Sequence, residues 1–231
     1  MTQIDFHAHI LPGCDHGSDG WETSRRQLVL ARKAGVGMIC ATSHFYGHQI
    51  SVERFLDKRQ HCYEELMAHA PQNAPKVVLG AEVLAFEGID RLPGLKELRL
   101  QGTRTLLLEM PFQRWSEELL DAVEAISDDD DFRIVLAHVD RYDRKAVEKL
   151  FRLDHVKGQV NVDNLKKVFG TRYLREWIRE GHIVAVGSDI HGTETGYRDW
   201  LTCRARYADD WETIMKRTNR RLGPFLEQAS E

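Results

Sequence analysis

The sequence predicts an α/β fold: a single domain over residues 1–231, built as a closed or nearly closed barrel of parallel strands. Three observations lead to this prediction. The length of 231 residues is normal for one α/β barrel. Seven short apolar segments alternate with segments of helical periodicity, which predicts parallel strands joined by right-handed crossovers. The apolar segments are nearly continuous, as is typical of strands buried on both faces.

The expected elements follow one another along the chain. The expected strands cover residues 3–6, 37–42, 76–80, 105–108, 133–137, 158–162 and 182–187. The expected helices cover residues 23–34, 52–68, 117–126, 145–151 and 165–179, with a terminal helix over 210–227. An open, doubly wound sheet is the alternative arrangement. The chain has neither GxGxxG nor GxxxxGK(S/T), which disfavours a nucleotide-binding fold of that kind.

Composition and charge narrow the function classes. The net charge of −4 indicates no overall preference for nucleic acid or an anionic membrane. No apolar stretch approaches the roughly 20 residues of a membrane span, and the first residues lack the features of a signal peptide. The four cysteines, Cys14, Cys40, Cys62 and Cys203, have no CxxC spacing and are expected to be reduced thiols. We therefore expect a cytoplasmic protein without a membrane span or a nucleic-acid partner.

The residues that end the apolar segments carry the main functional signal. Most of these segments end on, or lead into, a histidine or an acidic residue: His7 and His9, His44, Glu82, Glu109, His138, and Asp189 with His191. His16 follows in the loop after the first strand. In a barrel the carboxyl ends of the strands meet on one face, which carries the active site. Residues two apart on a strand point to the same side, so the His7–His9 and Asp189–His191 pairs are each expected to face that site.

Six imidazoles and three carboxylates gathered at one mouth indicate a metal centre. Without cations the carboxylates would repel one another, and desolvation would raise their pKa values. Imidazole and carboxylate ligands suit Mn, Fe, Zn or Co, and nine ligands exceed the needs of one or two ions, so we expect three divalent ions. Taken singly, each residue is more often a helix cap, a salt-bridge partner or a surface histidine. The prediction rests on their joint placement.

The remaining histidines are assigned structural or surface positions. His61 and His69 fall on an expected helix, His155 in a loop, and His182 at the start of a strand, at the opposite end from the site. His48 lies just beyond His44 and is kept as a candidate substrate contact.

Several segments of this chain resemble the PHP (polymerase and histidinol phosphatase) superfamily. They are HAHILPGCDHG at 7–17, ATSH at 41–44, GAE at 80–82, LLLEMP at 106–111, LAHVDRY at 136–142 and GSDIH at 187–191. Within the superfamily, the HxHILPG opening and the AHxxRY motif are most similar to the CpsB/CapC-type bacterial protein-tyrosine phosphatases. The resemblance extends over about residues 5–198, with the motifs in family order.

The resemblance implies a distorted (β/α)7 TIM-like barrel, the PHP fold, with three divalent ions, manganese first among them. It assigns His7, His9, Glu82 and Asp189 to one ion, with Glu82 bridging to a second. Glu109 and His138 complete the second site, and His16, His44 and His191 hold the third ion.

The resemblance also implies two phosphate-binding arginines, for which Arg141 and Arg198 have the matching spacings. For Arg141 the competing interpretation is a surface salt bridge with Asp140 or Asp143. One position departs from the pattern: the subfamily usually reads Asp-Asp-Gly where this chain has Asp15-His16-Gly17. Asp15 is therefore either a ligand itself or the partner of an imidazole N–H.

The leading functional prediction is hydrolysis of phosphate monoesters by a metal-activated water, with Arg141 and Arg198 neutralising the phosphate oxygens. The resemblance implies phosphotyrosyl proteins as substrates, in exopolysaccharide or capsule regulation. The alternatives are a small-molecule phosphoesterase for histidinol phosphate, a sugar phosphate or a nucleotide, a non-catalytic metal-binding regulatory domain, and an amidohydrolase. The last is disfavoured because that family has eight strands and a lysine ligand.

Two further sequence features bear on the substrate and the chemistry. A cysteine-based phosphatase needs an arginine six residues after its cysteine. The four cysteines are instead followed at that distance by Gly20, Tyr46, Ala68 and Asp209. Aromatic residues in the expected site-side loops favour an aromatic or peptide substrate: Phe45, Tyr46, Phe112, Trp115, Tyr142 and Tyr197.

Overall fold

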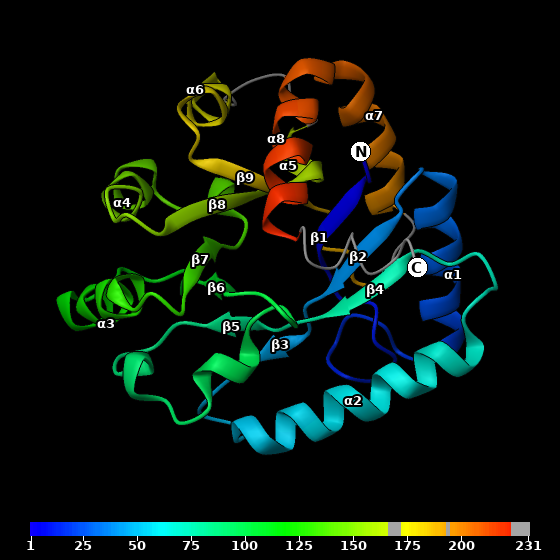
Figure 1. Cartoon of the computed structure of the whole chain (residues 1–231), viewed down its shortest axis with the longest axis horizontal. Helices are drawn as coiled ribbons and strands as arrows, with labels where there is room; N and C mark the ends of the chain where they lie inside the picture. The colour runs from blue at the N-terminus through cyan, green and yellow to red at the C-terminus, as the bar shows by residue number, and fades with distance from the viewer. Residues whose placement is uncertain (166–171, 193–194, 223–231) are drawn as a thin grey trace.

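Parallel strands occupy the middle of the molecule, and helices surround them (Figure 1). The computed structural model describes residues 1–165, 172–192 and 195–222. The strands are β1 Ile4–Ala8, β2 Met38–Ala41, β3 His44–Phe45, β4 Lys76–Leu79, β5 Glu82–Leu84, β6 Thr105–Glu109, β7 Arg133–Leu136, β8 Val156–Asn161 and β9 Ile183–Gly187. They form two parallel sheets, β1-β2-β4 and β3-β5-β6-β7-β8-β9. The predicted α/β class with parallel strands is confirmed.

The two sheets belong to one distorted barrel. Strands β2 and β3 are separated by two residues, as are β4 and β5, so each pair continues one bent segment from the first sheet into the second. The nine strands therefore occupy seven positions, the number of apolar segments in the sequence. After β9, the N–H of Asp189 donates to the carbonyl of His7 at 2.8 Å, and the N–H of His9 donates to the carbonyl of Ile190 at 3.2 Å. These bonds place the end of β9 beside β1.

The helices follow the strands in the expected alternation. They are α1 Trp21–Lys33, α2 Val52–His69, α3 Glu117–Asp128, α4 Arg144–Leu150, α5 Val162–Leu165, α6 Arg172–Glu180, α7 Thr195–Arg206 and α8 Ala208–Arg221. Side-chain oxygens of Ser51, Ser116 and Asp143 accept backbone N–H groups at the starts of α2, α3 and α4, as expected of N-cap residues. No helix among the described residues is long and apolar enough to cross a membrane.

Three expectations differ from the structure. The helix expected over 165–179 is two helices, α5 and α6, and residues 166–171 lie outside the described part of the chain. The terminal helix expected over 210–227 begins earlier, at Ala208, and its predicted residues from 223 on also lie outside the described part. Helix α7 is not among the expected helices, because its apolar residues give no clear amphipathic stripe.

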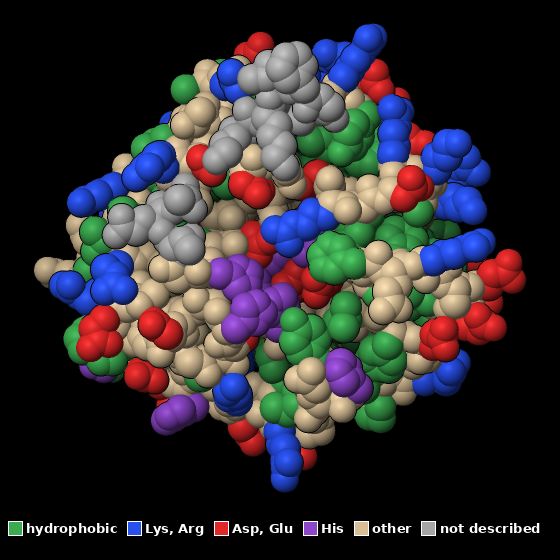
Figure 2. Space-filling view, turned by 180° about the vertical axis from the view of Figure 1, so that it is seen from behind, with side chains coloured by type: hydrophobic (Ala, Val, Ile, Leu, Met, Phe, Trp, Pro, Cys, Tyr) green, Lys and Arg blue, Asp and Glu red, His purple; other side chains and the backbone are tan. Residues whose placement is uncertain are grey.

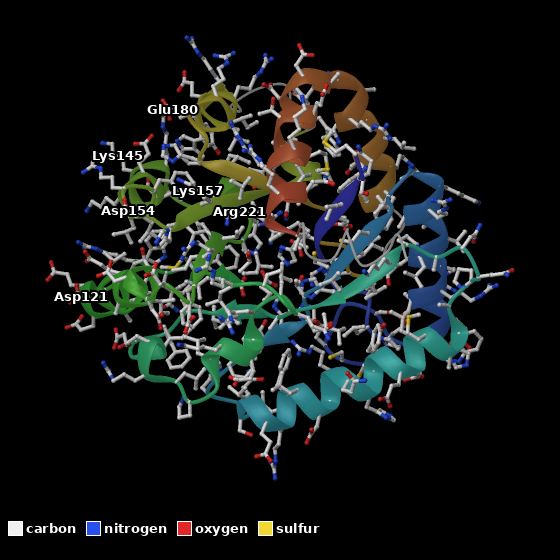
Figure 3. All side chains as sticks on the ribbon, viewed as in Figure 1. Asp121, Lys145, Asp154, Lys157, Glu180 and Arg221 are labelled. Carbon is white, nitrogen blue, oxygen red and sulfur yellow. The ribbon has the colours of Figure 1, made fainter. Side chains whose placement is uncertain are left out.

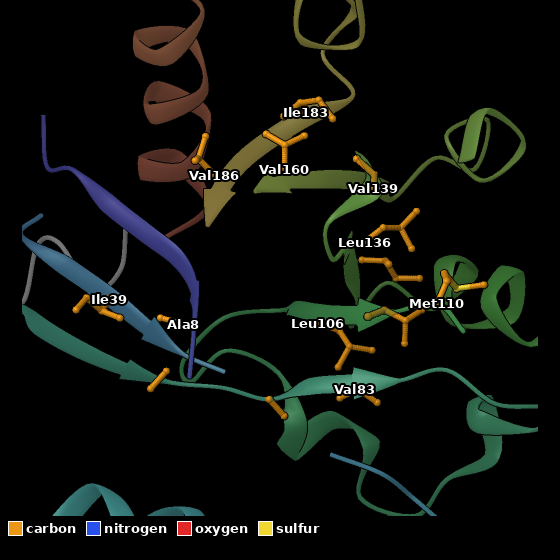
Figure 4. Close-up of a cluster of buried hydrophobic side chains, with 14 of the residues drawn as sticks. Ala8, Ile39, Val83, Leu106, Met110, Leu136, Val139, Val160, Ile183 and Val186 are labelled. Atoms are coloured by element: carbon orange, nitrogen blue, oxygen red, sulfur yellow. The ribbon is translucent and has the colours of Figure 1, made fainter. Parts of the chain in front are cut away.

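Apolar side chains pack in two layers, one on each side of the strands. The outer layer joins the strands to the helices, and Figure 4 shows its strand residues, Leu106 and Leu136 among them. The intervening Leu107 and Val135 belong to a second cluster, which contains strand residues but none from the surrounding helices. Successive side chains thus point alternately to the helices and to the interior, as in a barrel whose inner side chains fill its centre. Leu222, just after α8, joins the inner cluster.

A bulge in β1 directs the first two histidines into the barrel. Between Asp5 and Ala8 the strand gains one residue relative to β2, where the partners are Ile39 and Ala41. Phe6 lies in the inner cluster, whereas Ala8 lies in the outer one, so the alternation changes between them. As a result His7 and His9, on the opposite side from Ala8, face the interior.

A second bulge does the same for β9. Gly158 of β8 pairs with Ile183, but Gln159 pairs with Ala185, so β9 carries the extra residue. Val184 and Ala185 therefore both lie in the inner cluster. The extra residue changes which side chains of β9 face the interior, from Ala185 to the strand end that leads into Asp189.

Candidate metal centre

The predicted ligands gather at the carboxyl ends of the strands. Figure 2 shows histidines in a hollow at the centre of this face, with acidic side chains beside them. They come from β1 and the residue after it (His7, His9), β3 (His44), β5 (Glu82), β6 (Glu109) and the segments after β7 (His138) and β9 (Asp189, His191). The structure thus brings together side chains that are up to 184 positions apart in the sequence, from position 7 to position 191.

Glu82 is the centre of the cluster and is only 1% exposed. Its Oε2 lies 3.2 Å from Nε2 of His7, 3.2 Å from Nε2 of His9 and 2.9 Å from Nδ1 of His44. Its other oxygen, Oε1, lies 3.0 Å from Nε2 of His138. One buried carboxylate is therefore in contact with four imidazoles, which is the arrangement expected of a ligand shared between ions.

The other two carboxylates approach different pairs of the histidines that contact Glu82. Glu109 places Oε1 3.5 Å from Nε2 of His138 and Oε2 3.9 Å from Nδ1 of His44. Asp189 places Oδ1 3.4 Å from Nε2 of His9 and 3.6 Å from Nε2 of His7. In two overlapping groups, His7-His9-Glu82 and His44-Glu82-Glu109, the donor atoms lie within 4.8 Å of one another.

A third group consists of imidazoles alone. Donor atoms of His9, His44 and His191 also lie within 4.8 Å of one another. His16 is exposed, and its ring centre is 4.7 Å from that of His44 and 4.8 Å from that of His191. His16 therefore lies at the open side of the cluster, where it closes the imidazole group toward solvent.

Two of these residues hold a strained backbone. His138 has φ of 31° and Asp189 has φ of 48°, and they are the described non-glycine residues in the left-handed region. Such a conformation costs on the order of 1–3 kcal/mol and persists where the surrounding structure requires it. Each residue lies two positions after the end of a strand, so the strain turns a side chain into the cluster where the chain leaves the barrel.

Mixed charges perturb the titration of the cluster. Burial alone would raise the pKa of Glu82, but the charge of His7, the hydrogen bond from His138 and the adjacent imidazole of His44 hold it well below its usual value. Burial would lower the pKa of His138, but hydrogen bonds to Glu109 and Glu82 raise it to about 9. In the protein without metal, protons therefore hold part of the positive charge that these carboxylates require.

The buried donor atoms fit divalent cations. Nδ1 of His44 and Oε2 of Glu82 lie 2.9 Å apart, yet neither makes a hydrogen bond with any described residue. An imidazole nitrogen and a carboxylate oxygen each carry a lone pair that can bind a cation. Imidazole and carboxylate are ligands of first-row divalent metals, and the four buried cysteines are not needed.

Asp15 supports the imidazoles from behind. Its Oδ2 accepts from Nδ1 of His9 at 2.8 Å and from the backbone N–H of His44 at 2.9 Å. Because Nδ1 of His9 carries the proton, Nε2 presents a lone pair to the cluster. Of the two roles left open for Asp15, the contacts favour the partner of an imidazole N–H.

Two buried amide side chains on β8 support His7 in the same way, and they were not predicted from the sequence. Oε1 of Gln159 lies 3.1 Å from Nδ1 of His7 and accepts from the N–H of His138 at 2.7 Å. Nε2 of Gln159 donates to Asn161, whose Nδ2 donates to Oδ2 of Asp189. The available signal was two amides at alternate positions of one strand, Gln159 and Asn161.

Two glycines let neighbouring backbone approach the histidines. A Cβ on Gly187 would lie 2.5 Å from Cβ of His7 and 2.7 Å from Nε2 of Gln159. A Cβ on Gly17 would lie 2.2 Å from Cβ of His9. Any side chain at either position would displace a candidate ligand.

The two predicted phosphate-binding arginines have different surroundings. Arg141 is 35% exposed and donates from Nη2 to Oδ2 of Asp189 at 2.6 Å. Asp140 instead accepts from Asn161, and Asp143 caps α4, so neither proposed surface salt bridge forms. Arg198 is exposed on α7, and no contact between it and the cluster is found among the described residues.

The site-side aromatic residues divide into mouth and core. Tyr46 stacks on His44 at 5.2 Å, and Phe112 and Tyr142 face His138 at 6.3 and 5.6 Å. Phe45 and Tyr197 are instead buried in the core, so the expectation that these two line the site is wrong. Both belong to the apolar layer that joins the strands to the helices.

Tyr197 has a structural partner. Its hydroxyl donates to Oδ2 of the fully buried Asp5 at 2.9 Å, and Oδ1 of Asp5 accepts from the N–H of Ser188 at 2.8 Å. Asp5 thereby ties β1 to the segment that carries Asp189. His48 is exposed and contacts the ring of Tyr46 at 6.0 Å, outside the cluster.

Comparisons with known proteins identify a family for nearly the whole chain. Residues 3–214 match the sequence model of a family described as capsular polysaccharide synthesis, CpsB/CapC. No curated protein matches the chain. Among solved structures, one is similar with a TM-score of 0.76 and 20% identity, covering 95% of this chain and 94% of that chain. Its description reads "Crystal structures of YwqE from Bacillus subtilis and CpsB from Streptococcus pneumoniae, unique metal-dependent tyrosine phosphatases".

More distant structures share only the barrel architecture. Dihydrodipicolinate synthase from Acinetobacter baumannii has a TM-score of 0.51 at 14% identity, covering 95% of this chain and 80% of that chain. DAHP synthase from Thermotoga maritima has a TM-score of 0.50 at 14% identity, covering 90% and 69%. These likenesses show the fold, and the family match covers nearly the whole chain. The chain therefore belongs to the CpsB/CapC family of capsular polysaccharide synthesis.

Proposed function

We propose that this protein is a metal-dependent phosphatase that hydrolyses phosphotyrosine on proteins, in the regulation of capsule or exopolysaccharide synthesis. The observation that carries the proposal is the buried carboxylate of Glu82, in contact with four imidazoles at the barrel mouth. The similar solved structure supports the same activity, because its description names YwqE from Bacillus subtilis and CpsB from Streptococcus pneumoniae as metal-dependent tyrosine phosphatases. In this proposal residues 1–231 act as one domain.

We assign the donor atoms to three divalent ions, with manganese as the first candidate. His7, His9, Glu82 and Asp189 would hold one ion, and Glu82 would share a second with Glu109 and His138. His16, His44 and His191 would hold the third. Bound divalent ions supply a coordinated water of lowered pKa and neutralise phosphate oxygens.

The residues of the chain have distinct roles in this proposal. Asp15 and Gln159 keep the Nε2 atoms of His9 and His7 directed at the centre. Arg141, at the mouth, binds phosphate oxygens through its planar guanidinium, and Arg198 is proposed as a second such residue. The leaving phenolate has a pKa near 10 and needs no strong acid, which agrees with the absence of an obvious general acid among the described mouth residues.

We further propose a cytoplasmic location, because the buried thiols of Cys14, Cys40 and Cys62, which form no disulfide, suit a reducing compartment. Phosphotyrosyl proteins are the proposed partners. Small phosphate esters would occupy the same cluster, and the test below separates the two substrate classes.

The test is a substrate panel with metal-loaded protein. Protein reconstituted with Mn²⁺ would be offered p-nitrophenyl phosphate, a phosphotyrosyl peptide, histidinol phosphate and dihydroorotate as a cyclic amide. We expect hydrolysis of the first two, loss of activity on chelation and recovery on adding metal. Elemental analysis should give three ions per chain. Hydrolysis of the amide alone would contradict the proposal, and no turnover at all would favour a metal-binding regulatory domain.

A further inference from the structure

A groove leads away from the metal cluster between the β6–α3 connection and the start of α4. Its volume is about 650 Å³, which is large for a small phosphate ester. Arg141 and Tyr142 line the groove and also border the cluster, through the contact of Arg141 with Asp189 and of Tyr142 with His138. The groove is therefore continuous with the candidate active site.

One wall of the groove is aromatic and held in place. The ring of Phe112 lies nearly parallel to that of His138, and Phe112 is 69% exposed. Trp115 packs edge-on against Tyr142 at 5.6 Å and donates from Nε1 to the carbonyl of Pro111. The hydroxyl of Tyr142 accepts the N–H of Met110 at 3.0 Å. The exposed ring of Phe112, beside the half-buried and hydrogen-bonded Trp115 and Tyr142, suits contact with a peptide or with the ring of a tyrosine.

The groove is also lined by basic side chains. Arg114, Lys145 and Lys149 are exposed and make no ion pair with any described residue. Figure 3 marks Lys145 on α4, near the edge of the molecule. On the same helix, Arg144 forms an ion pair with Glu148, so α4 contains basic side chains both with and without an ion-pair partner among the described residues.

Acidic residues offset this charge only in part. The carboxylates that line the groove are those of Asp143 and Glu117. Asp143 is already engaged, since its side chain accepts the N–H of Ala146 as the N-cap of α4. Counting Arg141 as well, four cations face two carboxylates, so the groove is complementary to an anionic occupant.

We propose that this groove binds the peptide segment beside the phosphotyrosine and selects segments that carry aspartate or glutamate. The inference rests on the proposed function. With the phosphate at the cluster and held by Arg141, the peptide chain leaves along Phe112 and Tyr142. Acidic side chains next to the phosphotyrosine then reach Lys145 and Lys149.

The experiment compares three phosphotyrosyl peptides of equal length, whose flanking residues are acidic, uncharged or basic. With Mn²⁺-loaded wild-type protein at low salt we expect kcat/KM to be about tenfold higher for the acidic than for the uncharged peptide, because several exposed charge pairs contribute. The basic peptide should be the poorest substrate. Raising the salt concentration should narrow the differences.

Charge-reversal variants locate the effect. Lys145→Glu combined with Lys149→Glu should abolish or invert the preference for the acidic peptide, measured as the ratio of the two kcat/KM values. The milder pair Lys145→Gln and Lys149→Gln should give an intermediate ratio. Lys33→Glu, an exposed lysine in the last turn of α1, is the matched control and should keep the wild-type ratio.

The outcomes separate the inference from the function on which it rests. If the metal-loaded protein hydrolyses p-nitrophenyl phosphate but turns over the three peptides equally, the groove proposal is overturned and the phosphatase proposal stands. The same holds if the double charge-reversal variant keeps the acidic preference. If the metal-loaded protein hydrolyses no phosphate ester, both are overturned.

Discussion

The two ends of the barrel hold their charged side chains in different ways. At the carboxyl end, Glu82 and its neighbours lie against one another, buried and with donor atoms that lack hydrogen-bond partners. At the amino end, guanidinium groups donate to backbone carbonyls. Arg104 donates to Asp130 at 3.0 Å, and Arg217 donates to Ile178 and Ile183 at 2.5 and 2.9 Å.

The difference separates activity from stability. Carbonyls that end helices and begin strands require donors, and a guanidinium supplies several from one side chain. Those interactions stabilise the fold without any ligand. The mouth instead concentrates like charges, left-handed residues and unpartnered atoms, which cost stability unless cations are bound. Changes at the mouth should therefore affect catalysis most, and changes at the amino end should affect unfolding.

The largest expected effect is that of Glu82→Gln. The amide cannot bridge two cations as a carboxylate does, so we expect kcat/KM for p-nitrophenyl phosphate to fall by about 1,000-fold or more. Bound metal, measured by elemental analysis, should fall with it. Glu124→Gln, an exposed position on α3, is the control. Retention of full activity in Glu82→Gln would remove the distinction between the two ends.

The positions of the strands could be predicted because a buried parallel strand leaves a run of apolar residues in the sequence. Each predicted strand overlaps one in the structure. The two-residue strand β3 and the three-residue strand β5 are too short to leave such a run. The bulges in β1 and β9 leave no signal either, because they depend on pairing with a neighbouring strand.

The candidate site could be predicted where the signal is a charged residue at a strand end, as for Glu82 and His138. Gln159 was missed because an uncharged amide inside a strand does not differ in type from a surface residue. The role of Asp15 depends on the path of the loop after β1, which brings its carboxylate to both His9 and His44. Local sequence does not contain that information.

Arg141→Ala should have the next largest effect. We expect kcat/KM to fall by about 100-fold, because the charge of the phosphate is no longer matched, while metal content stays the same. Arg141→Lys should recover only part of the loss, since an ammonium lacks the planar fork. Steady-state kinetics and elemental analysis measure the two quantities. Parallel loss of metal would mean that Arg141 acts through its contact with Asp189 instead.

Arg217→Ala tests the other end of the barrel. Removing the guanidinium leaves the carbonyls of Ile178 and Ile183 without this donor, so the free energy of unfolding should fall by about 1–3 kcal/mol. Urea denaturation measures it. Activity toward p-nitrophenyl phosphate should stay within about twofold of wild type. Arg220→Ala, at an exposed neighbouring position, should change stability by less than about 0.5 kcal/mol.

The smallest expected effect is the pH dependence of the metal-free protein. Burial lowers the pKa of His138, but hydrogen bonds to Glu109 and Glu82 outweigh it and raise the pKa to about 9. A raised histidine pKa adds stability that is fully present below the unfolded value near 6.5 and is lost as the pH rises through 9. The Tm of chelated protein should therefore fall on the order of 5 °C from pH 7 to pH 9.

The metal-loaded protein should show a smaller fall over the same interval, because a histidine that binds metal is already neutral. His138→Gln in chelated protein should also flatten the dependence, since the titrating imidazole is gone. Differential scanning calorimetry at several pH values measures all three. If Tm falls equally with pH in chelated and metal-loaded protein, then bound metal does not replace the protons that neutralise the carboxylates at the mouth. The contrast between the two ends would then rest on geometry alone.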